Sequence, residues 1–123
     1  MTTPQIKRAY DAPAPDDGTR VLVDRLWPRG LSRERAHIDC WLKDVSPSHE
    51  LRAWFAHDPA RFDEFRQRYE AELAANPAAQ AALAHLRTLA QESRLTLVYA
   101  ARDAAHNNAV VLRDLLARQA NGS

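Results

Sequence analysis

The chain has 123 residues, of which 46% are hydrophobic, and this size and composition suit one domain with a core of its own. Its 17 Lys and Arg residues are nearly matched by 16 Asp and Glu residues, so the formal net charge is +1. This balance argues against a general nucleic-acid binder, which carries a strongly basic face, but it leaves room for a local basic pocket. We expect a single domain over residues 1–123, with an ordered core over about residues 4–118.

Cys40 is the only cysteine, so the chain can form no internal disulfide, which fits a reducing compartment. The N-terminal stretch MTTPQIKRAY lacks the apolar core of a signal peptide, and no stretch approaches the roughly 20 apolar residues of a membrane span. We therefore expect a cytoplasmic protein without a membrane partner.

The first third of the chain alternates strand patterns with turn residues. Residues 5–10 alternate between polar and apolar and predict a short strand, and the turn-forming run DAPAPDDG follows at 11–18. Residues 19–27 predict the central strand of a parallel sheet, because VLV and LW form an apolar run of the kind that is buried on both faces. Ser32 is expected to cap one helical turn, and residues 37–42 to form a third strand.

Helical patterns fill the middle of the chain. One helix is predicted after the SPS motif at 46–48, a second from Asp58, which is followed by a proline at the first helical position, and a third over Pro77–Glu92. Apolar residues at helical spacing predict the core-facing side chains of the last two helices: Phe62, Phe65, Tyr69, Leu73, Leu83, Leu86 and Ala90.

The C-terminal part has the order strand, loop and helix. Residues 95–100 (LTLVYA) predict a second buried strand, residues 102–106 a polar loop, and residues 107–118 a final helix. A strand, a helical middle, a strand and a helix imply a right-handed crossover and a parallel pair. The expected fold class is α/β: a three-layer α/β/α domain on a small, mainly parallel sheet.

Charged residues interrupt the central strand near its end. Asp24 and Arg25 lie inside the apolar run, and charges beside a buried strand cost several kcal/mol unless they are paired or lie at a wet rim. In open α/β sheets, ligands bind just beyond the carboxyl ends of the strands. We therefore predict a site here, with Arg25 and Arg29 as anion-binding residues and Trp27 as a residue that stacks on the ligand.

The end of the second buried strand predicts the other half of the site. In YAARDAAHNNAVVL (99–112), a polar loop is followed by a helix whose first turn offers unpaired N–H groups to an anion. Arg102 and Asn107 are the predicted ligand-binding residues of this half. If the two strands are parallel neighbours, Arg25 and Arg102 share one pocket that accepts a phosphate- or carboxylate-bearing small molecule.

His106 and Asp24 are the candidate catalytic residues. His106 is the candidate for proton transfer because the ordinary pKa of histidine lies near neutrality, and Asp24 or Asp103 would orient it or an arginine. The alternative is that these charges form structural ion pairs, Arg25 with Asp103 or Asp24 with Arg102. The coincidence of two charged strand ends favours the binding hypothesis.

Three segments together resemble the YeaO-like proteins, a bacterial family of unknown function: RVLVDRLWPRG at 20–30, SHELRAWFAHDPARFDEFRQRYEAEL at 48–73 and TLVYAARDAAHNNAVVL at 96–112. The resemblance covers almost the whole chain and implies a small α/β protein, but it implies no established reaction. The residues that match the motifs are Asp24, Arg25, Trp27, Pro28, Arg29, Gly30, Asn107, Arg102 and His106.

Other site chemistries fit the sequence poorly. The chain has only 3 glycines and no glycine-rich phosphate loop. Cys40 and His37 fall on opposite faces of the predicted strand, so Cys40 is expected to be an inert thiol, and His37 with Asp39 lacks the further ligands of a metal site. His57 is interpreted as a hydrogen-bonded histidine at a helix junction. We expect no metal and no cofactor.

Several functions stay open at this point. The first is an anion site in an enzyme or enzyme-like domain, and the sequence does not decide whether the protein is catalytic. The alternative is a non-catalytic binding module for a nucleic-acid end or a protein partner. A third is a structural domain that docks through the Trp54–Phe55 helix. The substrate, the reaction and the oligomeric state are not predicted.

Overall fold

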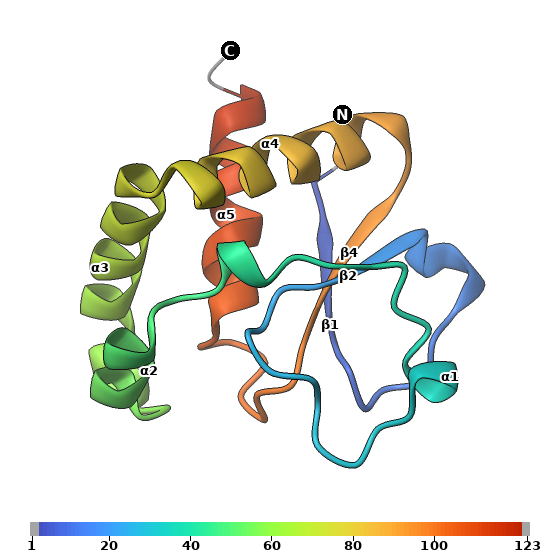
Figure 1. Cartoon of the computed structure of the whole chain (residues 1–123), viewed down its shortest axis with the longest axis horizontal. Helices are drawn as coiled ribbons and strands as arrows, with labels where there is room; N and C mark the ends of the chain where they lie inside the picture. The colour runs from blue at the N-terminus through green and yellow to red at the C-terminus, as the bar shows by residue number, and fades with distance from the viewer. Residues whose placement is uncertain (1–2, 122–123) are drawn as a thin grey trace.

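Four parallel strands form one sheet in the order β1-β4-β2-β3, in a computed structural model that describes residues 3–121 (Figure 1). The strands are β1 (Gln5–Arg8), β2 (Thr19–Leu22), β3 (Cys40–Trp41) and β4 (Leu95–Tyr99). The α-helices are α1 (Arg33–Ala36), α2 (His49–Phe55), α3 (Phe62–Ala75), α4 (Pro77–Glu92) and α5 (Asn108–Asn121), and 3-10 turns lie at Pro15–Asp17, Lys43–Val45 and Pro59–Arg61. The parallel sheet confirms the predicted α/β class; the outermost residues of the predicted domain 1–123 lie outside the described residues.

The two strands at the centre of the sheet are those that the sequence predicts to be buried. Val21 of β2 pairs with Leu97 of β4, and Leu22 pairs with Val98; all four side chains are buried. Every residue of β4 is buried. Chain segments cover both faces of these strands, which is why their sequences are continuous apolar runs.

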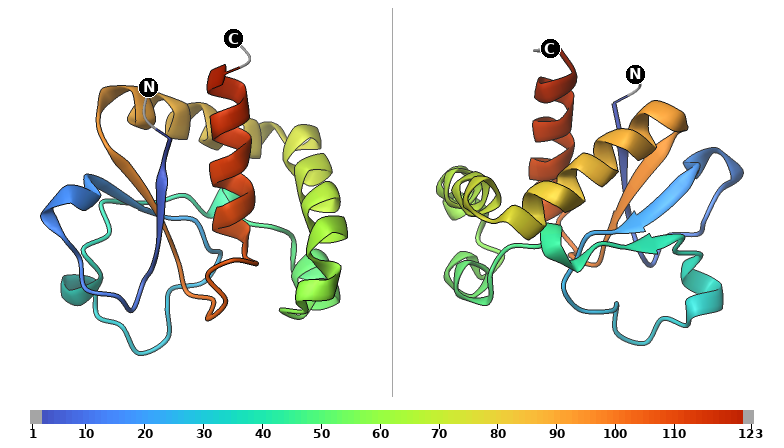
Figure 2. Two further views of the ribbon diagram at one scale, coloured as in Figure 1. Left: turned by 180° about the vertical axis from the view of Figure 1, so that it is seen from behind. Right: turned by 45° about the horizontal axis from the view of Figure 1, so that its top comes forward.

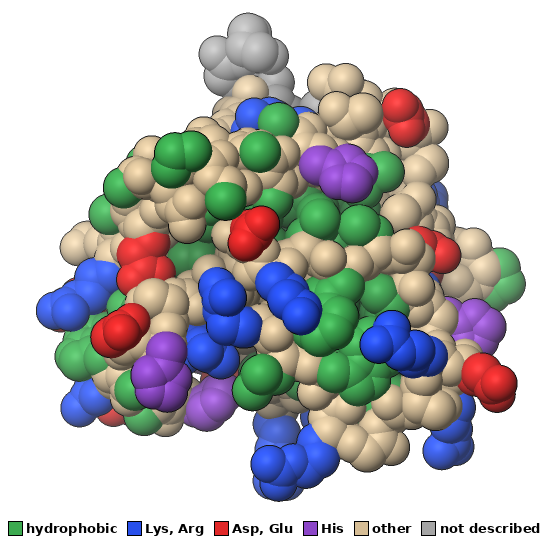
Figure 3. Space-filling view, in the orientation of Figure 1, with side chains coloured by type: hydrophobic (Ala, Val, Ile, Leu, Met, Phe, Trp, Pro, Cys, Tyr) green, Lys and Arg blue, Asp and Glu red, His purple; other side chains and the backbone are tan. Residues whose placement is uncertain are grey.

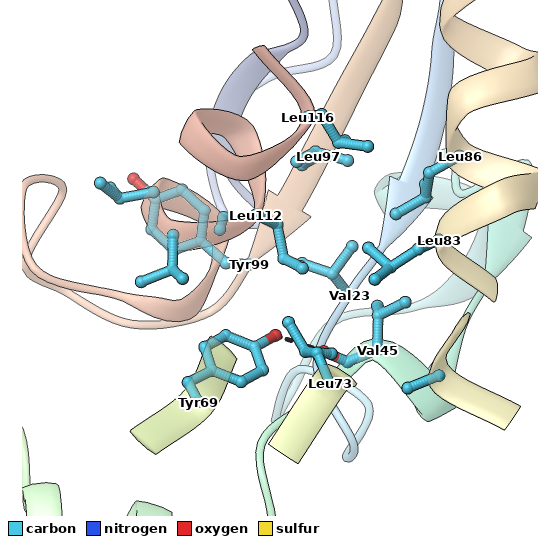
Figure 4. Packing of buried hydrophobic residues seen from close by; sticks show 14 of the residues in the cluster. Val23, Val45, Tyr69, Leu73, Leu83, Leu86, Leu97, Tyr99, Leu112 and Leu116 are labelled. Atoms are coloured by element: carbon cyan, nitrogen blue, oxygen red, sulfur yellow. Dashed lines mark hydrogen bonds between the residues drawn. The ribbon is translucent and has the colours of Figure 1, made fainter. Parts of the chain in front are cut away.

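Helices α2 to α5 cover one face of the sheet (Figures 1 and 2). Figure 4 shows Leu83 and Leu86 of α4 facing Leu112 and Leu116 of α5, with Leu97 of β4 next to Leu116. All seven predicted core-facing residues of α3 and α4 are buried: Phe62, Phe65, Tyr69, Leu73, Leu83, Leu86 and Ala90. Within residues 3–121, no helix is both long and apolar enough to cross a bilayer.

The other face is covered by the segment between β2 and β3. Helix α1 in this segment is a single turn, and Ser32 caps it as predicted, with Oγ accepting the N–H of Arg35 at 3.1 Å. A small second cluster lies beneath it, in which Trp27, Leu31, Ile38 and Trp41 pack on Ala9, Leu22 and Val98. The third layer of the predicted arrangement is therefore one short helix and the chain that flanks it.

The connections on opposite faces create a crevice between β2 and β4. The chain leaving β2 turns toward the face of α1, whereas the chain leaving β4 turns toward α5 on the opposite face. Such a switch point at the carboxyl ends of adjacent strands is the usual ligand site of open α/β sheets. At the opposite, amino edge of the sheet, β1 begins and α5 ends (Figure 1).

The predicted central strand, 19–27, is shorter than expected and ends at Leu22. The N–H of Val23 still donates to the carbonyl oxygen of Val98 at 3.1 Å, but at Asp24 a side chain takes over the contact with the neighbouring chain. The strands predicted at 5–10 and 95–100 likewise end early, at Arg8 and Tyr99.

The predicted third strand, 37–42, is reduced to Cys40–Trp41. His37 adopts a left-handed backbone with φ 49° that ends α1, so it cannot begin a strand. The N–H of Asp39 donates to the carbonyl oxygen of Arg20 at 2.8 Å, but the N–H of Arg20 donates to the Asp39 carboxylate, also at 2.8 Å, and not to a backbone oxygen. The final helix, predicted over 107–118, spans Asn108–Asn121.

Candidate functional site

Asp24 joins the ends of the two central strands. Its Oδ2 accepts the N–H of Ala100, just after β4, at 2.9 Å, and its Oδ1 accepts Nδ2 of Asn108, the first residue of α5, at 3.0 Å. The same amide nitrogen of Asn108 donates to the carbonyl oxygen of Val23 at 3.1 Å. The carboxylate therefore fixes β2, β4 and the start of α5 relative to one another at the switch point.

Burial raises the pKa of Asp24 above the ordinary carboxyl value. Hydrogen bonds from Asn108 and Ala100 and the positive charges of Arg52 and His57 lower this pKa, but they do so by less than burial raises it. Neutral hydrogen-bond donors, together with nearby cations that make no direct bond to Asp24, therefore offset part of the cost of burying its charged form.

A pocket of about 400 Å³ lies beside Asp24 at this switch point. One wall is the whole segment 24–29 together with Tyr10, which follows β1. The chain that follows β4 and enters α5 contributes Ala100, Ala101, Asn107 and Asn108. The helical side contributes Pro47, Arg52, Phe55, His57 and Phe65.

Three arginines line the pocket beside the single carboxylate of Asp24. Arg25 and Arg29 have exposed side chains, and Arg52 is half-buried on α2. Within residues 3–121, none of their guanidinium groups makes a hydrogen bond or an ion pair, and Nε of Arg52 is buried without a partner. The pocket therefore has an excess of positive charge. In the orientation of Figure 1, Figure 3 shows several Lys and Arg side chains over the lower half of the visible face, with hydrophobic side chains and some Asp, Glu and His side chains among them.

Helix α2 is held so that both Arg52 and His57 reach the pocket. At its start, Ser48 caps the helix, and its N–H donates to the Glu72 carboxylate of α3 at 2.9 Å. At its end, Ala56 and His57 both adopt a left-handed backbone, with φ 48° and 58°. Residues other than glycine held in this region cost roughly 1–3 kcal/mol each and cluster at functional sites.

Two predicted ligand-binding residues line the pocket with their polar atoms already engaged. Nε1 of Trp27 donates to the carbonyl oxygen of Leu31 at 2.6 Å. The Asn107 side chain accepts the N–H of Val110 at 3.1 Å and donates to the carbonyl oxygen of Asp103 at 2.8 Å. Trp27 can therefore offer a ligand only its ring, and Asn107 caps α5.

The structure brings five of the predicted site residues to one pocket: Asp24, Arg25, Trp27, Arg29 and Asn107. The other two, Arg102 and His106, are not among its lining residues. The Asp103 carboxylate fixes the conformation of the loop that carries them, because it accepts hydrogen bonds from the N–H groups of Ala105 at 2.9 Å and of His106 at 3.1 Å.

His106 belongs to a separate local cluster. Its Nδ1 lies 2.9 Å from Oδ2 of Asp103, and its ring packs edge-on against Phe62, with 5.2 Å between the ring centroids. The hydrogen bonds from Ala105 and His106 lower the pKa of Asp103. Neither of the structural pairs considered from the sequence, Arg25 with Asp103 or Asp24 with Arg102, forms within residues 3–121.

Sequence reasoning did not assign Arg52 to the site, and it interpreted His57 as a junction residue. A signal for Arg52 exists in SHELRAWF, because Arg52 lies three residues before Phe55 and so shares a helix face with it. Nothing in the local sequence places that face against the carboxyl edge of the sheet. Tyr10 also lines the pocket, and no pattern in the sequence predicts it there.

Comparison with known proteins shows a family match over nearly the full chain. The model described as "Inactive DUF488-N3 subclade" matches residues 4–122. The uncharacterized protein YeaO of Escherichia coli K12 is 42% identical over 112 residues, which cover 91% of this chain and 95% of YeaO. The uncharacterized protein Rv3073c of Mycobacterium tuberculosis H37Rv is 48% identical over 115 residues, 94% of each chain. No solved structure matches significantly.

Proposed function

The chain belongs to the YeaO-like family described as the inactive DUF488-N3 subclade, and from this premise we propose that it binds a phosphate- or carboxylate-bearing small molecule at the switch-point pocket without transforming it. The pocket is the one defined above by the segment 24–29, the start of α5 and the end of α2.

The observation that carries this proposal is the set of three arginines without partners among the described residues. A buried donor without an acceptor costs about 1–3 kcal/mol, and the Nε of Arg52 is such a donor. Guanidinium groups bind oxyanions in a bidentate manner, so a phosphate or carboxylate in the pocket would pair with the terminal nitrogens of Arg52 together with Arg25 or Arg29. The N-terminal end of α5, where Asn107 and Asn108 line the pocket, adds a favourable partial positive charge.

A binding role is favoured over catalysis by two observations. The family description itself reads "inactive". The predicted proton-transfer residue, His106, is engaged by Asp103 outside the pocket lining, and both carboxylate oxygens of Asp24 already accept hydrogen bonds. The histidine that does line the pocket, His57, is one of the groups whose positive charge lowers the pKa of Asp24.

We place the protein in the bacterial cytoplasm as part of the same proposal. Cys40 is the only cysteine and is a free thiol, which fits a reducing compartment, and the relatives named above are bacterial proteins.

Isothermal titration and thermal unfolding with inorganic phosphate and acetate test the proposal. Ligand at about 100 times its Kd should stabilise the fold by about 2.7 kcal/mol. Arg25→Gln and Arg52→Gln should weaken binding on the order of tenfold each. Arg35→Gln is the matched control, because Arg35 is an exposed arginine on α1 outside the pocket lining, and it should bind as the wild type does.

The proposal is overturned if neither anion binds at millimolar concentration, or if Arg35→Gln weakens binding as much as Arg52→Gln does. Release of nitrophenol from p-nitrophenyl phosphate, lost in Arg52→Gln, would show turnover and contradict a purely binding role.

A further inference from the structure

We infer that the ligand of this pocket carries its phosphate or carboxylate on a flat aromatic ring, so that the protein binds a small aromatic anion in preference to the inorganic ion. This inference rests on the proposed function and names its ligand class.

The pocket is larger than an inorganic anion needs. Its volume of about 400 Å³ falls within the range of roughly 300–1,000 Å³ that holds an organic ligand. Inorganic phosphate or acetate would contact the arginines and leave most of this space to water. A ligand that fills the pocket therefore needs a body attached to its charged group.

The lining of the pocket indicates that this body is apolar. Phe55 and Phe65 line the pocket from the helical side while remaining buried, with exposed fractions of 5% and 2%. Their rings stack with a centroid separation of 4.3 Å, so the surface that they offer is rigid. Pro28 and Pro47 add further apolar surface without donors.

Exposed hydrophobic side chains also line this pocket. Among the described residues, the large hydrophobic side chains that are exposed are Tyr10, at 44%, and Leu26, at 68%, and both line this pocket. Apolar side chains left in water at a site are typical of ligand-binding surfaces. Covering Leu26 and Tyr10 with an apolar group would remove this surface from water.

The ring of Tyr10 favours a flat partner over an aliphatic one. Its hydroxyl donates to the carbonyl oxygen of Arg29 at 2.8 Å, and the guanidinium of Arg8 lies 5.2 Å from the ring centroid. The ring is therefore fixed before a ligand arrives and can stack on it at little entropic cost. The guanidinium groups of Arg25 and Arg29 also stack favourably on aromatic faces while they bind the charged group.

The experiment compares matched pairs of probes on the full chain by isothermal titration: phenyl phosphate with inorganic phosphate, and benzoate with acetate. The aromatic member of each pair should bind on the order of tenfold more tightly. Leu26→Ser should lower the affinity for phenyl phosphate by a larger factor than the affinity for inorganic phosphate, because Leu26 carries no charge. Leu26 is largely exposed, so this variant should fold as the wild type does. Cyclohexyl phosphate, which is apolar but not flat, should bind more weakly than phenyl phosphate.

Equal affinities within each pair would overturn this inference while leaving the proposed anion site intact. Cyclohexyl phosphate binding as tightly as phenyl phosphate would overturn the aromatic part of it. Failure of every probe to bind would instead overturn the proposed function itself, so the two failures can be told apart.

Discussion

Clusters of basic and acidic side chains lie at both ends of β2, and they differ in how their charges are paired. At the start of the strand, Arg20 donates to Asp17 at 2.7 Å, and Lys7 reaches the same carboxylate at 3.2 Å. Arg20 and Asp17 are each only 3% exposed. At the end of the strand, Asp24 accepts hydrogen bonds from neutral groups, and Arg52 has no hydrogen-bond partner among the described residues.

The pKa values of the two aspartates are shifted in opposite directions. Burial raises the pKa of both, but at Asp17 the hydrogen bonds from the N–H of Ala14, from Lys7 and from Arg20 outweigh it, and the net shift is downward. At Asp24 burial prevails and the pKa is raised. In the first cluster, the charged groups are paired with one another within the chain, so the cluster is structural. The second leaves arginines without partners among the described residues, which is the arrangement that the proposed anion site requires.

Arg20→Met should destabilise the protein more than any other substitution considered for these two clusters. The substitution leaves the buried Asp17 carboxylate with Lys7 and the N–H of Ala14 as its remaining partners, and it removes the donors to the carbonyl oxygen of Ala36. Breaking a buried pair in this way costs about 3–5 kcal/mol, which urea unfolding measures. Binding of phosphate by the protein that remains folded should not change. A loss below about 1 kcal/mol would mean that this cluster is not structural.

Asp24→Asn should have a smaller effect on stability. The Asp24 carboxylate accepts hydrogen bonds from Ala100 and Asn108, and an amide group can accept only one of them while its NH₂ group faces the other donor. We expect a loss of about 1–3 kcal/mol in urea unfolding, together with tighter phosphate binding because a negative charge leaves the pocket. Asp16→Asn is the control, since that side chain is 74% exposed. Weaker phosphate binding in Asp24→Asn would contradict the predicted sign.

Arg52→Met should leave stability within about 1 kcal/mol of the wild type, or raise it, because the substitution removes a buried donor without a partner. Phosphate affinity should fall on the order of tenfold in the same variant. Arg20→Met is the natural comparison, since it should do the reverse. A loss of several kcal/mol in Arg52→Met would make this arginine structural and would remove the distinction between the two clusters.

The smallest effect is expected in the pH dependence of stability. The folded pKa of Asp24 lies above the ordinary value of 3.8, so its contribution to stability rises as the pH falls toward 3.8. The folded pKa of Asp17 lies below 3.8, so its contribution is present above that pH and is lost as the pH falls further. Urea unfolding at several pH values should show the wild type gaining on Asp24→Asn as the pH falls toward 3.8, and losing its advantage over Asp17→Asn below it. The same profile in both variants would contradict the assignment of opposite shifts.

The parts of the fold that the sequence predicts well are those that local interactions determine. Helix α4 begins and ends as predicted, because Oδ1 of Asn76 accepts the N–H groups of Ala78 and Ala79 and Pro77 fits the first helical position. The predicted strands are longer than the observed ones, because a side chain such as Asp24 can replace the backbone in the hydrogen bonds between strands. The apolar pattern of a sequence does not show where this replacement occurs.

The site could be predicted only in part, for a related reason. Arg25 and Arg29 follow a buried strand directly, so the polarity of the sheet already places them at its carboxyl edge. The path of the loop that carries His106 depends on which N–H groups the Asp103 carboxylate accepts. The position of Arg52 depends on how α2 packs on α3. That packing is fixed by contacts between residues that lie 24 apart in the sequence.

The chain starts β1 and finishes α5 at the amino edge of the sheet, away from the pocket at the carboxyl edge. An affinity tag, a fluorescent fusion or a biotin attached at either end should therefore leave the pocket mouth open. Protein anchored to a sensor chip through either end should bind a small anion with the same affinity, and fused reporters should be tolerated without loss of binding.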